Sequence, residues 1–226
     1  NYQHLRYETE LISNSVTLQV NERFRELERL AERVPLPREG ALFEQHAYKM
    51  EPLFEALMLF DVSSQVVDEW PIDGGRRGNN FADREYARFM NAFNTPYVSE
   101  PLFGRISNTP LVLMLVPLRD DEGRYTGFLG GLVNFKQSQL FRNFDQLRLG
   151  EGGYVTITTA TGQRIYDPYQ KEAIVTLPDT ISPILRQALD GWEGESHGRS
   201  LTGEDQLVAY RQIWPANWIV GVHLPQ

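Results

Sequence analysis

The side chains best suited to binding a ligand lie in one loop and at the start of the helix that follows it. Asp73–Asn80 reads DGGRRGNN, and Arg84 and Tyr86 come soon after it. The guanidinium of Arg84 offers a planar fork of donors that fits a carboxylate or a phosphate, and Tyr86 could offer its hydroxyl. Each also has an ordinary structural role. Arg84 could pair on the surface with Asp83 or Glu85, and Tyr86 could pack in the core.

Further positions could form the walls of a pocket beside this helix. Tyr97 and Ser99 alternate on the strand after the helix, and Met114 lies in the middle of an apolar run. Core packing is an equal alternative for Tyr97 and Ser99, and the more natural one for Met114. Within the loop, Arg76 and Arg77 could cover an anionic ligand or form a solvated tip.

Patterns typical of catalysis and metal binding are absent from the sequence. The chain has no cysteine, and its four histidines lack the i+3 or i+4 partner of a helical metal site. No Ser–His–Asp set or pair of catalytic carboxylates follows from the spacing. We therefore predict that this chain is not an enzyme and that it uses no metal and no cofactor. The histidines are His4, His46, His197 and His223.

Composition and charge narrow the choice of partners. The 226 residues carry a formal net charge of −8 and 41% of them are hydrophobic, so the chain can fold and could form two small cores. Nucleic acid and anionic lipid both require a basic face, which argues against them as partners. The lack of cysteine favours a bacterial periplasmic location. Because no apolar run approaches the ~20 residues of a membrane span, and the chain starts at Asn1, we expect a soluble piece of a longer protein.

The elements that must position these residues begin with a long helix. From residue 1 to about 34, apolar residues recur at steps of mostly four and three, with charged residues between them. Pro35 and Pro37 end the helix. The apolar stripe could pack on its own domain, which is the more natural arrangement, or form a seam between two chains. Its members are Leu5, Ile12, Val16, Val20, Phe24, Leu27, Ala31 and Val34.

The rest of the chain repeats one pattern of elements. Leu57–Pro71 and Tyr154–Pro168 each predict a strand, a small polar turn, a second strand and a proline stop. After each come an irregular loop, an amphipathic helix and three strand-like runs. This order predicts an α+β fold with two modules, each built on an antiparallel sheet. Polar groups cluster beside the helix of the first module alone, so we expect the first module, and not the second, to hold a ligand.

Several segments resemble a known family. They are Asp83–Arg105 (DREYARFMNAFNTPYVSEPLFGR), Val116–Phe135 (VPLRDDEGRYTGFLGGLVNF), Gly150–Pro168 (GEGGYVTITTATGQRIYDP) and the closing Leu207–Pro225. With the long helix, they resemble a double Cache (dCache) domain, the tandem PAS-like extracytoplasmic sensor of bacterial signalling proteins.

The resemblance implies an architecture and a function. A signalling helix would occupy 1–37, a membrane-distal Cache module that binds ligand 38–136, and a membrane-proximal module 137–226, each module with helices on one face of its sheet. The chain would be the periplasmic ligand-sensing domain of a bacterial inner-membrane protein, with flanking transmembrane helices. Its cytoplasmic output would be a cyclic-di-GMP enzyme such as a diguanylate cyclase, a histidine kinase or a chemoreceptor. The alternative is a ligand-free scaffold that forms a homodimer through the long helix or binds a partner protein.

Amino-acid sensors of this family hold the ligand carboxylate with an Arg-x-Trp-Tyr motif, and the amine with an acidic residue on the last distal strand. Here Arg84 is kept, Tyr86 and Ala87 replace the Trp and the Tyr, and Leu132 stands where the acid would be. A buried ammonium without an acidic partner is costly. We therefore predict an unidentified small-molecule ligand that is not a free amino acid. The predicted ligand-binding residues are Arg84, Tyr86, Tyr97, Ser99, Met114 and Leu132.

Overall fold

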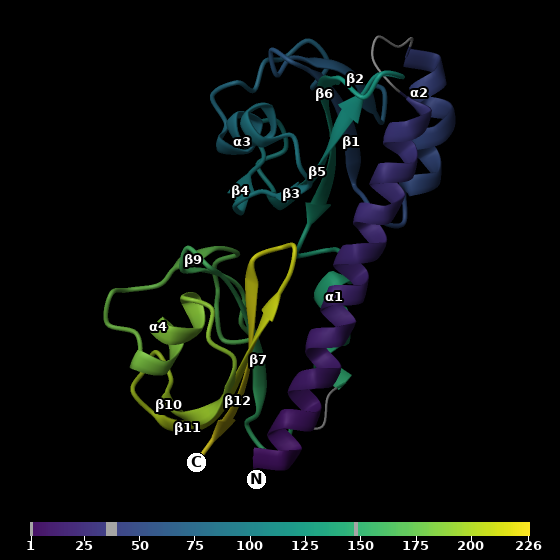
Figure 1. Cartoon of the computed structure of the whole chain (residues 1–226). Helices are drawn as coiled ribbons and strands as arrows, with labels where there is room; N and C mark the ends of the chain where they lie inside the picture. The colour runs from purple at the N-terminus through teal and green to yellow at the C-terminus, as the bar shows by residue number, and fades with distance from the viewer. Residues whose placement is uncertain (1, 35–39, 147–148) are drawn as a thin grey trace. The chain divides into compact units, whose positions relative to one another are not determined.

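The chain forms two α+β modules in the computed structural model (Figure 1). The first module is Val20–Ser138, and the second combines Asn1–Gln19 with Gln139–Gln226. Each contains one six-stranded sheet whose paired strands run antiparallel. The predicted fold class is therefore confirmed. The residues described are 2–34, 40–146 and 149–226.

Helix α1 (Tyr2–Arg33) is continuous over 32 residues, and the predicted stop at Pro35 and Pro37 lies outside the described residues. The structure buries the predicted apolar stripe, apart from Ala31, which is half-buried. Because these side chains are buried within one chain, they do not offer the exposed seam that a homodimer through this stripe would need.

The sheet of the first module has the strand order β2-β1-β6-β5-β3, with β4 also paired to β5. Helix α3 covers one face of this sheet, and α2 lies with α1 on the other side (Figure 1). The strands are β1 (Ala56–Asp61), β2 (Val66–Trp70), β3 (Tyr97–Val98), β4 (Leu102–Phe103), β5 (Pro110–Arg119) and β6 (Tyr125–Asn134), and the helices are α2 (Gly40–Ala47), the 3₁₀ turn η1 (Tyr48–Met50) and α3 (Glu85–Phe93).

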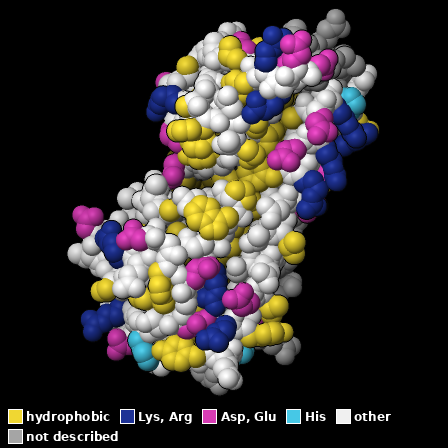
Figure 2. Space-filling view, viewed as in Figure 1, with side chains coloured by type: hydrophobic (Ala, Val, Ile, Leu, Met, Phe, Trp, Pro, Cys, Tyr) yellow, Lys and Arg dark blue, Asp and Glu magenta, His cyan; other side chains and the backbone are white. Residues whose placement is uncertain are grey.

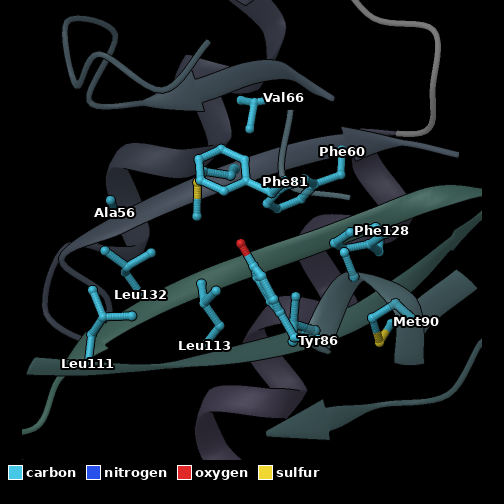
Figure 3. Close-up of a cluster of buried hydrophobic side chains, with 13 residues drawn as sticks. Ala56, Phe60, Val66, Phe81, Tyr86, Met90, Leu111, Leu113, Phe128 and Leu132 are labelled. Carbon is cyan, nitrogen blue, oxygen red and sulfur yellow. The ribbon is translucent and has the colours of Figure 1, made fainter. Parts of the chain in front are cut away.

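An apolar cluster joins α3 to the sheet in the first module (Figure 3). Side chains alternate along each strand, so every second residue of β1, β5 and β6 faces α3. Tyr86 and Met90 reach this cluster from the helix. The strand residues are Ala56, Met58, Phe60, Val66, Leu111, Leu113, Leu115, Phe128 and Leu132.

The second module repeats the topology of the first. Its strand order is β10-β11-β12-β7-β8-β9, so β8-β7-β12-β11-β10 follows the order of β2-β1-β6-β5-β3 and the predicted repeat of elements is confirmed. Ser182 caps α4 by accepting a hydrogen bond from the Leu185 N–H. The elements are the 3₁₀ segment η2 (Gln139–Gln146), β7 (Tyr154–Thr159), β8 (Gln163–Tyr166), β9 (Val175–Thr176), α4 (Pro183–Leu189), β10 (Gly194–Arg199), β11 (Asp205–Ile213) and β12 (Trp218–Pro225).

The expectation that the second module has no polar cluster beside its helix is wrong. Tyr154 pairs with His223, and Val208 also pairs with His223, so these side chains share the face that packs against α4. Gln206 lies on the same face by alternation along β11. The residues are far apart in sequence, and the strand pairing brings them together.

The surface carries charges of both signs. In Figure 2, acidic and basic side chains are mixed over the face in view. Within the described ranges, no helix is both long and apolar enough to cross a membrane.

Candidate functional site

A small cavity of about 30 Å³ lies between α3 and the sheet in the first module. Apolar side chains of β1, β5 and β6 form its floor, and the loop before α3 and the segment after β4 form its mouth. The lining residues are Met58, Arg76, Phe81, Arg84, Tyr86, Leu102, Gly104, Arg105, Ile106, Leu111, Leu113 and Leu132. Three of them are arginines and none is acidic, so the mouth favours an anionic group.

Arg84 stands at the N-cap of α3 in an extended conformation, with φ −84° and ψ 142°. Its side chain lines the cavity and has no hydrogen-bond or ion-pair partner among the described residues. Asp83, a partner that the sequence offered, instead accepts hydrogen bonds from Nη2 of Arg105 at 2.7 and 2.9 Å. These bonds lower the pKa of the exposed Asp83 carboxyl. The guanidinium of Arg84 is therefore available to a ligand anion.

Arg105 and Arg76 frame the same cavity. The Arg105 guanidinium donates to the carbonyl of Asn80 at 3.1 Å and lies 4.7 Å from the centroid of the Phe81 ring, a cation–π contact that helps to fix it. Nη1 of Arg76 lies 3.5 Å from the carbonyl oxygen of Gly74. The interpretation of Arg76 as part of a solvated tip is therefore wrong, because its side chain forms part of the cavity wall.

Tyr86 points from α3 toward the sheet (Figure 3). The residue is 4% exposed, and its hydroxyl oxygen lies in the space bounded by Phe81, Leu113 and Leu132. That hydroxyl has no hydrogen-bond partner among the residues that the structure describes. Burial, partly offset by the charge of Arg84, raises the pKa of the Tyr86 hydroxyl. The hydroxyl stays protonated and can donate to a ligand.

Glu69 on β2 is a further candidate, which the sequence patterns did not indicate. A β-bulge shifts the register between β1 and β2, so that Glu69 pairs with Met58 while Val66 pairs with Phe60. Strict alternation would place Val66 and Glu69 on opposite faces, but the extra residue brings both to the face that carries the cavity. Glu69 is 2% exposed, and its Oε1 has no hydrogen-bond partner in the described part of the chain.

The other carboxylate oxygen of Glu69 holds the loop at the cavity mouth. Oε2 accepts hydrogen bonds from the backbone N–H of Arg76, at 2.9 Å, and from that of Arg77. We call this pair of hydrogen bonds the Glu69 latch. A Cβ at Gly74 would lie 2.3 Å from Oε1 of Glu69, so a glycine is needed where the loop crosses the carboxylate.

We expect Glu69→Ala to lower the free energy of unfolding by about 1 to 3 kcal/mol, because it leaves two loop N–H groups without their acceptor. Urea unfolding followed by circular dichroism measures the loss. The matched control is Asp121→Ala, which removes an exposed carboxylate in a turn. Equal unfolding midpoints for the two variants would contradict the role of the latch.

Of the six residues predicted to bind ligand, Arg84, Tyr86 and Leu132 line the cavity. Met114 does not, because it pairs with Gly131 on the opposite face of the sheet. The apolar run that contains Met114 has no alternation, so the sequence could not show which face it occupies.

Tyr97 and Ser99 also lie outside the cavity lining. Tyr97 stacks on Phe89 with 3.8 Å between ring centroids, and its hydroxyl donates to Glu85. Oγ of Ser99 accepts from the Leu113 N–H at 2.8 Å and donates to a neighbouring carbonyl. Tyr97 and Ser99 therefore take part in packing and in the hydrogen bonds of the sheet, and not in the lining of the cavity.

Comparisons with known proteins place the chain within one family. The family model described as Cache domain (dCache_1) matches residues 2–226. The ligand-binding domain of the Pseudomonas aeruginosa PAO1 amino acid chemoreceptor PctB, solved with L-Arg, is 15% identical with a TM-score of 0.80, over 100% of this chain and 88% of that one. The domain of PctC from the same organism, solved with GABA, is 18% identical with a TM-score of 0.75, over 99% of each chain.

A longer protein shares the fold as well. An extracellular ligand binding receptor from Desulfohalobium retbaense DSM5692 is 15% identical with a TM-score of 0.77. The match covers 98% of this chain and only 40% of that receptor. No curated protein matches the sequence.

The prediction that the ligand is not a free amino acid is wrong. Solved domains with this fold include PctB with L-Arg and with L-Gln, and the Pseudomonas fluorescens chemoreceptor CtaA with L-isoleucine. The prediction relied on Leu132 standing where an acidic residue was expected, as if no other strand could supply the acid. The register of β1 and β2 places Glu69 on the same face of the sheet.

The sequence and the fold of the chain independently indicate the same family. The family model matches all but the first residue of the chain, and the two sheets repeat the same strand order. The chain therefore belongs to the Cache domain family, in its double form.

Proposed function

We propose that this chain is the extracytoplasmic ligand-sensing domain of a bacterial transmembrane signalling protein, and that its first module binds a free amino acid. Membership of the Cache domain family supports the sensing role, and chemoreceptor ligand-binding domains share the fold. In this proposal, residues 38–136 are the membrane-distal module, 137–226 are the membrane-proximal module and α1 leads to the inner membrane. The output is a cyclic-di-GMP enzyme, a histidine kinase or a chemoreceptor.

The observation that carries the proposal is the arginine-lined mouth above an apolar floor. An amino-acid carboxylate would bind the guanidinium of Arg84, which has no partner among the described residues, with Arg105 and Arg76 nearby. Charge-assisted hydrogen bonds of this kind are about twice as strong as neutral ones. The Tyr86 hydroxyl would add a neutral donor from the helix side.

Glu69 is the residue that we propose as the partner of the ammonium group once the mouth of the cavity opens. A buried ammonium needs an opposite charge and hydrogen-bond acceptors, and Oε1 of Glu69 is a buried acceptor without a partner among the described residues. Glu69 pairs with Met58, which lines the cavity, whereas Glu69 itself lies outside the lining of the closed cavity. The ligand side chain would then face the apolar floor formed by residues such as Leu113 and Leu132.

Ligand binding requires the mouth of the cavity to open. A volume of about 30 Å³ accommodates on the order of one water molecule, which is too little for an amino acid. The loop 73–80, held by the Glu69 latch, and the segment after β4 must therefore move. A ligand that binds the open and closed arrangements with different affinities shifts their populations, and that shift is the signal.

Calorimetric titration of the purified chain with the twenty amino acids tests the proposal. We expect at least one to bind, and the corresponding amine and the acid without the amino group to bind more weakly. A ligand at one hundred times its Kd should also raise the free energy of unfolding by about 2.7 kcal/mol. Absence of binding across the whole panel would contradict the proposal.

We expect Arg84→Ala to weaken amino-acid binding by about 10- to 100-fold, because hydrogen bonds to charged groups contribute about 1.5 to 3 kcal/mol. The control is Arg124→Ala, which removes an exposed guanidinium paired with Asp120 in the β5–β6 turn. Circular dichroism verifies that both variants fold. An unchanged Kd in Arg84→Ala would exclude Arg84 from the site.

A further inference from the structure

We infer that the second module holds a separate ligand site, one that takes a small planar monocarboxylate. A cavity of about 690 Å³ opens in this module, and its lining residues all fall within 154–225. It is far larger than the cavity of about 30 Å³ in the first module. The site is independent of the proposed amino-acid site, because the two share no residue.

The floor of this cavity is a polar face of the sheet. Tyr154 and Gln206 line the cavity, and His223 lies behind them on the same face, which packs against α4 through Val208 and Tyr210. In the first module, the corresponding face carries the apolar cluster beneath α3. Buried polar side chains are uncommon in an ordinary core, and a few of them converging on a cavity are typical of a ligand pocket.

A chain of hydrogen bonds fixes the floor before any ligand arrives. The Tyr154 hydroxyl donates to Oε1 of Gln206 at 3.2 Å, and Nε2 of Gln206 lies 2.9 Å from Nδ1 of His223. Nε2 of His223 lies 2.8 Å from Oγ1 of Thr156. Burial, with a contribution from the charge of Arg164, lowers the pKa of His223. The ring is therefore neutral, accepting at Nδ1 and donating from Nε2.

Arg164 supplies a buried positive charge to the cavity wall. Its side chain is 4% exposed, its Nε donates to Oγ1 of Thr158 at 3.2 Å, and its Nη1 lies 3.4 Å from Oδ2 of Asp167. A guanidinium has more N–H donors than these acceptors use, and the described residues offer it no further acceptor. Because burial of a charge is costly unless its hydrogen bonds are completed, a ligand carboxylate is the group that fits beside Arg164.

Two tyrosines select a planar ligand. The rings of Tyr154 and His223 are stacked, with 4.6 Å between centroids and 6° between planes. Tyr169 meets Tyr154 edge to face at 5.1 Å, lines the cavity and is 70% exposed. An aromatic ligand ring can make offset-stacked or edge-to-face contacts with such side chains. An aliphatic ring of the same size cannot make these contacts.

The charges around the mouth limit the ligand to one negative charge. Asp167, the ion-pair partner of Arg164, lines the cavity, as do Glu172, Glu204, Asp205 and Lys171. The last four are exposed, so solvent screens them, whereas Arg164 is buried. The acidic side chains would still repel a second carboxylate outside the range of Arg164. A monocarboxylate therefore fits better than a dicarboxylate.

Calorimetry with a matched set of small molecules tests the inference. The planar carboxylates are benzoate, 4-hydroxybenzoate and nicotinate. The controls are cyclohexanecarboxylate, which is not planar, benzamide, which is uncharged, and benzylamine, which is cationic. We expect a planar carboxylate to bind at least about tenfold more tightly than each control. Absence of binding by all three at about 10 mM, or equal binding of benzoate and benzylamine, would overturn the inference.

Two variants assign the binding to this cavity. We expect Arg164→Gln and Tyr169→Ala each to weaken it by at least about tenfold, whereas Arg124→Ala should leave it unchanged. Because Tyr169 is exposed, Tyr169→Ala should fold. That variant therefore tests whether the ligand binds in this cavity even if Arg164→Gln does not fold. Binding that is insensitive to Tyr169→Ala, and to Arg164→Gln where that variant folds, would place the ligand elsewhere and overturn the inference.

Discussion

Replacing Arg211 by methionine is expected to lower the free energy of unfolding by about 3 to 5 kcal/mol. Nη2 of Arg211 lies 2.6 Å from Oε1 of Glu195, and its Nε lies 2.8 Å from Oε1 of Glu10 on α1. The side chains of Arg211 and Glu195 are 11% and 10% exposed. Methionine keeps the apolar stem but leaves Glu195 as a nearly buried carboxylate, with Arg6 at 3.4 Å as its remaining ion-pair partner. Urea unfolding measures the loss.

A double variant distinguishes the cost of leaving the Glu195 carboxylate unpaired from the cost of losing the packing of the Arg211 side chain. In Arg211→Met with Glu195→Leu, no unpaired carboxylate remains in the buried position. Replacement of a whole buried ion pair by apolar side chains is often neutral, whereas removal of one partner is strongly destabilising. We therefore expect the double variant to recover about half of the loss or more. A double variant as unstable as Arg211→Met would show that the unpaired charge is not the cause.

The ion pair between Arg211 and Glu195 makes the destabilisation by Arg211→Met depend on pH. Burial alone would raise the pKa of Glu195, but the hydrogen bonds and charges of Arg211 and Arg6 outweigh it, and the pKa lies below the ordinary 4.5. A lowered pKa in the folded state contributes stability that is present above the unfolded pKa and is lost as the pH falls through the folded pKa. The difference in unfolding free energy between the wild type and Arg211→Met should therefore be largest near neutral pH and shrink below pH 4.5.

Gly131→Ala is expected to lower the free energy of unfolding by about 2 to 3 kcal/mol. A Cβ at Gly131 would lie 2.5 Å from two carbons of the Phe54 ring, and Phe54 is 2% exposed. Gly131 pairs with Leu57 on one side and with Met114 on the other. Because both neighbouring strands hold the backbone in place, the aromatic ring must move. Thermal and urea unfolding both report the loss.

The neighbouring glycine is the matched control. A Cβ at Gly130 would point to the other face, where its nearest atom is a terminal methyl of Leu115 at 3.3 Å. That methyl can shift by a few tenths of an ångström, so Gly130→Ala should cost clearly less than Gly131→Ala. A larger loss for Gly130→Ala would contradict the assignment of the tight contact to the Phe54 side.

The elements of the fold could be predicted because their patterns are local. The long helix follows from apolar residues at helical spacing, and each hairpin is marked by a polar turn and a closing proline. The faces of the strands could not be predicted in the same way. The run around Met114 is apolar on both faces, and the bulge beside Val66 changes which residues of β2 point toward α3.

The candidate site was predictable only where its residues are close in sequence. Arg84 and Tyr86 stand together at the start of one helix, and both line the cavity. The ion pair between Arg105 and Asp83 joins residues 22 positions apart, so Arg84 could not be known to lack that partner. The cavity of the second module draws its lining from residues between Tyr154 and Pro225, and no local pattern connects them.

The Glu69 latch has a consequence for the evolution of the site. Its hydrogen bonds come from the main-chain N–H groups of Arg76 and Arg77, and not from their side chains. Every residue except proline supplies the same donor. Mutation can therefore exchange the side chains at these two positions, including that of Arg76 in the cavity wall, while the loop keeps its course, so that the lining of the cavity can change by single steps without loss of the fold.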